Sequence, residues 1–172
     1  TVISSGAFQR CSALTSIDIP NGVTEIGTSA FQGCTSLTSI TIPHGVTKMS
    51  YRAFQNCTSL QSINIPNSVT VIDGKFLQGC TSLESINIPN SVTNIGDDVF
   101  EGCTSLTSMS ITYTGTKIYK MNSRLRVSTI RSLIIADGFT EIDHNAFEYT
   151  SLESINIPHG VTEIGHHAFE RC

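Results

Sequence analysis

The residues best suited to chemistry are six cysteines, because a thiolate is a strong nucleophile and a metal ligand. Five recur at intervals of 23 residues, namely Cys11, Cys34, Cys57, Cys80 and Cys103, and the sixth is Cys172. A catalytic cysteine needs its own activating histidine or helix terminus. A thiol repeated at one place in successive units is typical of a small apolar packing residue. Stacked side chains also point in parallel, so we predict buried thiols without disulfides.

The histidines and carboxylates give no recognisable catalytic or metal-ligating motif. His166 and His167 are adjacent, but no cysteine or carboxylate is placed to complete a zinc shell. His44 and His159 lie several repeats apart. We find no phosphate-binding loop, no paired catalytic carboxylates and no serine triad. The sequence therefore predicts a protein that is not an enzyme and that carries neither a metal nor a cofactor.

A basic segment at 113–129 is the strongest local candidate for partner specificity. Its candidate contacts are Lys117, Tyr119, Lys120, Arg124 and Arg126, with Arg131 just after it. No Asp or Glu occurs between Glu101 and Asp137. Such a segment is suited to an acidic protein or a sulfated glycan. The alternative is a degenerate repeat whose basic side chains are simply solvated, and without a recognised motif we expect no specific nucleic-acid binding.

A repeat of about 23 residues must position these side chains. Its first apolar residue falls at Leu14, Leu37, Leu60, Leu83, Leu106, Ile130 and Leu152. A sustained period of this length predicts a solenoid. We expect one array over residues 1–172, with about seven coils of 23 residues and a degenerate repeat at 109–130. Both ends fall inside a repeat, so we expect a fragment of a longer protein.

The pattern of apolar residues, proline and glycine in each repeat predicts a strand, a turn, a short extended stretch and one helical turn. The apolar positions of the unit 14–36 are Leu14, Ile17, Ile19, Val23, Ile26, Ala30 and Phe31. Ile17 and Ile19 follow the alternation of a strand with one buried face, and Pro20 ends that strand because it has no N–H. The spacing at 28–34 favours a helical turn. Because one unit cannot bury these residues alone, stacking places them in columns. The predicted class is an α/β repeat with a parallel sheet on the concave face and short strands or helical turns on the other side.

The strand positions between the buried residues face outward on the concave surface. The third position is a serine in every copy, which we interpret as packing in a crowded sheet. The second and fifth positions vary, either because they recognise a partner or because exposed positions drift. Our candidate contacts there are Gln61, Asn64, Glu84, Asn87, Arg131, Glu153 and Asn156.

The motif L-x-x-I-x-I-P-x-x-V-x-x-I-x-x-x-A-F-x-x-C at 14–34 and 37–57 resembles the BspA-like leucine-rich repeats. The resemblance covers nearly the whole chain except about 20 residues after Ile111. It implies a leucine-rich-repeat solenoid in a bacterial cell-surface or secreted protein that binds host matrix proteins, other cells or glycans. It implies no catalytic residues.

The expected function is therefore a non-catalytic protein-interaction or adhesion module that binds a protein or glycan through the polar concave face. The alternatives are a structural spacer or a targeting array for a domain outside this segment. End-to-end self-association is a further expectation. The formal net charge is only −4 and no apolar run reaches the length of a membrane span, so we expect no membrane insertion.

Overall fold

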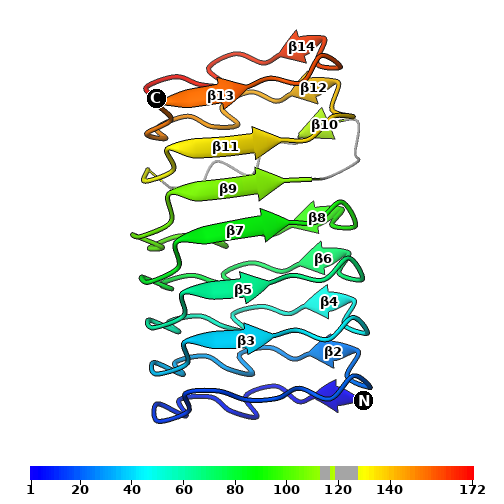
Figure 1. Ribbon diagram of the computed structural model, residues 1–172, viewed down its shortest axis with the longest axis vertical. Helices are drawn as coiled ribbons and strands as arrows, with labels where there is room; N and C mark the ends of the chain where they lie inside the picture. The colour runs from blue at the N-terminus through cyan, green and yellow to red at the C-terminus, as the bar shows by residue number, and fades with distance from the viewer. Residues whose placement is uncertain (113–116, 119–127) are drawn as a thin grey trace.

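The computed structural model describes residues 1–112, 117–118 and 128–172, and it shows successive coils stacked along one axis (Figure 1). Long strands follow one another along one side, the long-strand face: β3 (Ser39–Thr41), β5 (Ser62–Asn64), β7 (Ser85–Ile88), β9 (Ser108–Ile111), β11 (Ser132–Ile135) and β13 (Ser154–Asn156). Two-residue strands follow one another along the other side, the short-strand face: β1 (Val2–Ile3), β2 (Glu25–Ile26), β4 (Lys48–Met49), β6 (Val71–Ile72), β8 (Asn94–Ile95), β10 (Lys117–Ile118), β12 (Glu141–Ile142) and β14 (Glu163–Ile164). The predicted solenoid is confirmed.

Equivalent residues of neighbouring coils pair in parallel register. Ser39 pairs with Ser62 between β3 and β5, and Ser108 pairs with Ser132 between β9 and β11. The second pair keeps its register although the sequence between the two serines is one residue longer than the usual repeat. The extra residue is therefore accommodated outside the long strands.

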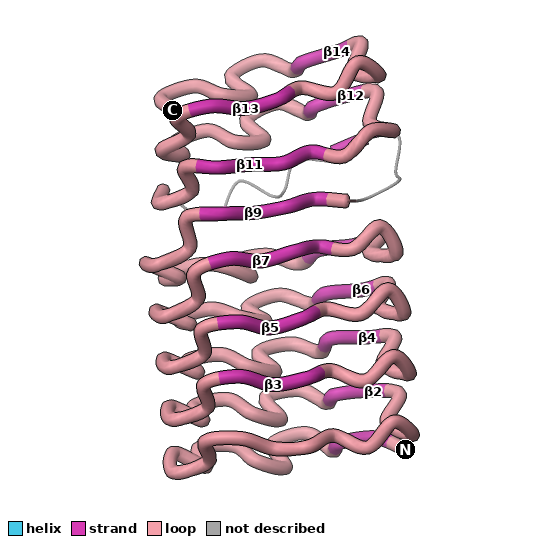
Figure 2. Tube along the Cα trace, in the orientation of Figure 1, coloured by secondary structure: helices cyan, strands magenta, loops and turns pink. Residues whose placement is uncertain are grey.

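The predicted helical turn is wrong, and with it the α/β class. Within the described residues there is no helix, and 28–34 is a series of turns (Figure 2). The N–H groups of Ser29, Phe31 and Gly33 donate at 2.8–2.9 Å to carbonyls of the next coil, and the N–H groups between them donate three residues back. A helix directs all its N–H groups along its own axis. Ser29 and Gly33 also have φ values of 56° and 74°, which interrupt right-handed helical geometry.

The predicted number of coils is slightly too high. The structure forms about six turns rather than seven, and residues 14–19, the long-strand segment of the first repeat, form no strand. There the link from Thr38 N–H to the Thr15 carbonyl is long, at 3.4 Å, and Ile17 is only half-buried. The pattern of apolar residues is present in this copy, but the hydrogen-bonded ladder that makes a strand is not.

The predicted core columns are confirmed through the middle of the stack. Each coil adds one residue to a column that runs along the solenoid axis, as for Leu37, Leu60, Leu83 and Leu106. A second column holds Phe31, Phe54 and Phe100, and all three rings are fully buried. At the ends, Leu14 and Leu152 are only partly buried. Burial is lower at the ends because each coil is covered by its neighbours, and an end coil has a neighbour on one side only.

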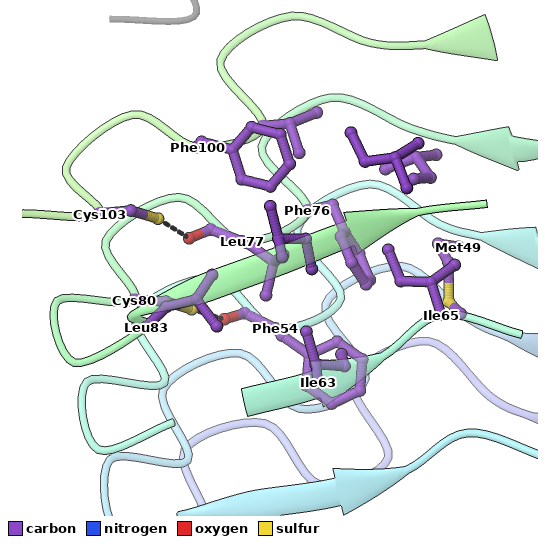
Figure 3. Close-up of a cluster of buried hydrophobic side chains, with 14 of the residues drawn as sticks. Met49, Phe54, Ile63, Ile65, Phe76, Leu77, Cys80, Leu83, Phe100 and Cys103 are labelled. Carbon is purple, nitrogen blue, oxygen red and sulfur yellow. Dashed lines mark hydrogen bonds between the residues drawn. The ribbon is translucent and has the colours of Figure 1, made fainter. Parts of the chain in front are cut away.

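One coil departs from the pattern of its neighbours, in which a smaller aliphatic residue precedes phenylalanine, as in Ala53–Phe54 and Val99–Phe100. Phe76 takes the alanine position and Leu77 takes the phenylalanine position, and both are fully buried. The stacked arrangement of Phe31 and Phe54, with centroids 5.0 Å apart, gives way to an edge-to-face contact of Phe54 with Phe76 at 5.5 Å (Figure 3). In this coil the aromatic ring thus occupies the first position of the pair and an aliphatic side chain occupies the second.

Among the described residues, no helix has the length and apolar character needed to cross a membrane.

Candidate functional site

The long-strand face is an ordered polar surface over an apolar interior. Ser39 and Thr41 of β3 are exposed on either side of the buried Ile40, and β5 and β7 repeat this alternation. Side chains alternate because successive Cβ atoms of a strand point to opposite faces. The predicted outward direction of the third and fifth positions is therefore confirmed in these coils. The second positions, Thr38, Gln61 and Glu84, lie just before the strands and are exposed as well.

All seven predicted contacts of the long-strand face lie in the long strands or one residue before them, and all are exposed: Gln61, Asn64, Glu84, Asn87, Arg131, Glu153 and Asn156. They lie in two rows along the stack, one at the second and one at the fifth position of the repeat. In the fifth-position row, Asn64 pairs with Thr41, Asn87 with Ser110, and Asn156 with Ile134. Their role in binding stays a prediction.

The serines of the third position form a column between these two rows. Ser132 is in register with Ser108 on one side and with Ser154 on the other. Because serine is short, it does not obstruct access to the longer side chains in the two flanking rows. The third position is therefore constant along the stack, while the side chains on either side of it differ from coil to coil.

Arg131 and Glu153 form the ion pair of the long-strand face, across neighbouring coils. The Arg131 guanidinium nitrogen lies 2.7 Å from a Glu153 carboxylate oxygen, and their side chains are 64% and 68% exposed. A pair this exposed adds little to folding stability. It leaves unused hydrogen-bonding capacity on both side chains for a partner.

The basic segment falls largely outside the described residues. Lys117 lies in β10, where its backbone pairs with Glu141 of β12. The other predicted contacts of this segment, Tyr119, Lys120, Arg124 and Arg126, lie outside the residues that the structure describes. Their proposed contribution stays a prediction from sequence.

The cysteines form a buried column of packing residues, as predicted. Cys34, Cys57, Cys80 and Cys103 are buried free thiols, whereas Cys11 and Cys172 are exposed. The Cys57 and Cys80 thiols donate to the carbonyls of Phe31 and Phe54 in the preceding coil, at 3.1 and 3.2 Å. Figure 3 shows the Cys80 contact and its equivalent from Cys103 to the Leu77 carbonyl.

Burial makes these thiols poor nucleophiles. Removal from water raises the pKa of Cys57 to about 12, with a smaller contribution from the neighbouring Cys34. Burial likewise raises the pKa of Cys103 to about 12 and holds that of Cys80 well above its ordinary value. Nucleophilic cysteines have a lowered pKa, so this column is suited to packing.

Two side-chain arrangements were missed by sequence reasoning. His144 and His166 stack with ring centroids 5.1 Å apart, although they are 22 residues apart in the sequence. A glutamine column also runs along the stack, in which Gln9, Gln32, Gln55 and Gln78 each donate to the side chain one coil on, ending at Glu101. The signal for the second was present, because a glutamine follows the core pair at a spacing of 23 residues. Among residues 1–112, 117–118 and 128–172, no group of three or more His, Cys, Asp or Glu is arranged to hold a metal ion.

Comparison with known proteins identifies the repeat. The model of the BspA type leucine rich repeat region matches residues 1–123 and 121–172, with six copies. None of the curated proteins matches the chain significantly.

Solved bacterial structures share the fold. A T. pallidum leucine-rich repeat protein is 29% identical, with a TM-score of 0.66, over 95% of this chain and 66% of its own. A leucine-rich cell surface protein of Faecalibacterium prausnitzii is 27% identical, with a TM-score of 0.62, over 96% of this chain and 59% of its own. A leucine-rich repeat protein of Eubacterium ventriosum has a TM-score of 0.64 at 20% identity, over 92% of this chain and 59% of its own, and shows the fold alone. The chain thus spans about 59–66% of the length of these proteins.

Proposed function

The chain belongs to the BspA-type leucine-rich repeat family, and on this basis we propose that it is a non-catalytic module that binds a partner through the long-strand face. The observation that supports this most directly is the pair of exposed, variable rows on either side of the constant serine column. The long strands form two parallel sheets, β3–β5 and β7–β9–β11–β13, and this backbone pairing positions the side chains before binding, which lowers the entropy lost on association.

The proposed role is adhesion by a surface or secreted protein, with a protein or glycan of a host or neighbouring cell as the partner. The name of the F. prausnitzii structure, a leucine rich cell surface protein, supports this location at 27% identity. The buried cysteine column is compatible with an oxidising exterior, because its thiols are covered and largely protonated.

The test is a binding screen against purified extracellular matrix proteins and glycosaminoglycans, with two matched double variants. Asn64→Ala/Asn87→Ala removes exposed amides from the long-strand face. Asn67→Ala/Asn90→Ala removes exposed amides from the same two coils just beyond the strands. We expect the first variant to lose binding of a retained ligand at least tenfold and the second to keep it.

Equal binding by both variants and by the Arg131→Glu variant would contradict recognition by the long-strand face. If these variants bind the ligand as tightly as the unsubstituted chain does, the long-strand face would be a structural spacer instead of a recognition surface. Circular dichroism of each variant checks that the solenoid is intact, as expected for substitutions at exposed positions.

A further inference from the structure

Ile134 is the one large apolar side chain among the described second, third and fifth positions of the long-strand face. It occupies the fifth position of β11 and is 59% exposed, while the corresponding residues of the other long strands are polar. Its register neighbours are Ser110 on β9 and Asn156 on β13, both polar. Ile134 is therefore an exposed apolar side chain between polar ones.

The backbone around Ile134 is held in place from both sides of the strand. Leu133 and Ile135 are each 4% exposed and point into the core. The N–H of Ser132 donates to the Thr107 carbonyl at 3.1 Å, and β11 pairs with both β9 and β13. An apolar side chain on a fixed strand can be covered by a partner without ordering the backbone, which is the property of an interface anchor.

The charge of the same face is predominantly negative. Its described acidic positions are Asp18, Glu84 and Glu153, and its described cation is Arg131, which is paired with Glu153. The Glu84 carboxylate has no ion pair among the described residues. A complementary partner therefore supplies a cation for Glu84.

Distances along the sheet define the spacing that such a partner needs. Glu84 lies two coils from Arg131, roughly 10 Å at the usual separation of parallel strands, and Ile134 lies three residues along from Arg131, again roughly 10 Å. The diagonal from Ile134 to Glu84 is then about 14 Å. Residues i and i+4 of an extended peptide lie on one face about 13 Å apart, which matches this diagonal.

We propose that the long-strand face binds an extended protein segment that places an apolar side chain on Ile134 and a lysine or arginine on Glu84. The inference rests on the proposed function and names the chemistry of its partner. A glycan is the less suitable occupant, because sugar rings pack well against aromatic faces and no aromatic side chain occupies the described second, third and fifth positions.

The probe is a phage-displayed library of random twelve-residue peptides, selected on the wild-type chain and counter-selected on Ile134→Ser. We expect retained peptides to be enriched in an apolar residue four positions from Lys or Arg. A synthetic peptide of that pattern should bind Ile134→Ser about tenfold more weakly than wild type, as expected for loss of an apolar contact of this size. Glu84→Gln should weaken binding and reduce its salt dependence.

The matched control is Ile164→Ser, because Ile164 is 49% exposed on β14 of the short-strand face. We expect this variant to bind the peptide as wild type does. Equal losses for the two isoleucine variants, enrichment of acidic peptides, or no enrichment at all would each overturn the inference.

The outcomes also separate this inference from the proposed function. Peptides or glycans that depend on Asn64 and Asn87 but not on Ile134 or Glu84 would overturn the inference and leave the proposed function standing. Peptides that no long-strand substitution affects would contradict both.

Discussion

The Nδ1 atom of His144 accepts a hydrogen bond from the backbone N–H of His166 at 2.7 Å, and the two imidazole rings stack across neighbouring coils. The same position of earlier coils is Thr28, Tyr51, Gly74 and Asp97. The His144 side chain thus adds a coil-to-coil link at this position. His144 must be unprotonated at Nδ1 to accept this bond.

We predict that His144→Phe keeps the ring stack but removes this acceptor. The His166 amide should then exchange with solvent about two- to tenfold faster, because a hydrogen bond of this kind contributes about 0.5–1.5 kcal/mol. Amide exchange followed by NMR measures the effect, and the buried Leu83 amide serves as the internal control. An unchanged rate at His166 would show that the imidazole does not protect this amide.

The cysteine column predicts that stability falls at alkaline pH. Burial raises the pKa of Cys57 and Cys103 from an ordinary value of 9.0 to about 12, so the folded state keeps protons that the unfolded chain releases. Their stabilising contribution is complete below pH 9 and is lost as the pH rises towards 12. Each thiol should lower the free energy of unfolding by up to about 1.4 kcal/mol per pH unit in this range.

Urea denaturation between pH 8 and pH 10.5, under reducing conditions, measures this slope. Cys57→Ala/Cys103→Ala should start less stable and show a shallower decline, because two of the titrating thiols are gone. A decline as steep as that of wild type would mean that other groups cause it.

The glutamine column predicts a position-dependent cost of losing one amide. Gln55 donates to Gln78 and accepts from Gln32, and it is buried. Gln55→Leu leaves a donor and an acceptor without partners, so we expect a loss of about 1–3 kcal/mol in the free energy of unfolding. Gln9→Leu removes one exposed contact at the end of the column and should cost less than about 0.5 kcal/mol. Urea denaturation measures both values, and equal losses of unfolding free energy in Gln55→Leu and Gln9→Leu would contradict the interpretation of the glutamine column as a buried hydrogen-bond network.

The spacing of about 23 residues was enough to predict the columns, because register in a solenoid follows from repetition alone. Leu60 lies above Leu37, and Cys57 above Cys34, as the sequence indicates. The helical turn was wrong for a local reason. The left-handed positions Ser29, Arg52, Lys75 and Asp98 are not glycines, so composition gave no signal of the φ values near 57° that break the helix there.

The exposed positions of the site were predictable, but their contacts were not. Alternation along a strand is enough to place Asn87 and Asn156 outward. The ion pair of Arg131 with Glu153 joins residues 22 apart, and so does the stack of His144 on His166. Both depend on the repeat that is one residue shorter, so neither follows from the usual spacing of 23 residues.

The exchanged core pair predicts a strong coupling between Phe76 and Leu77. Phe76→Ala alone should cost about 3–5 kcal/mol, because it leaves a cavity beside the buried Phe54 ring. Adding Leu77→Phe gives the Ala–Phe order of the preceding coil, Ala53–Phe54, and places a ring between Phe54 and Phe100. The double variant is still smaller than wild type by the difference between leucine and alanine, so we expect it to be about 2–3 kcal/mol less stable than wild type but more stable than Phe76→Ala alone.

Urea denaturation of wild type, both single variants and the double variant completes the cycle. Leu77→Phe alone should be destabilised by overpacking against Phe76. If the two single losses simply add in the double variant, the ring at position 77 does not fill the space that Phe76 leaves. The coil would then depend on the edge-to-face contact between Phe54 and Phe76 for its stability.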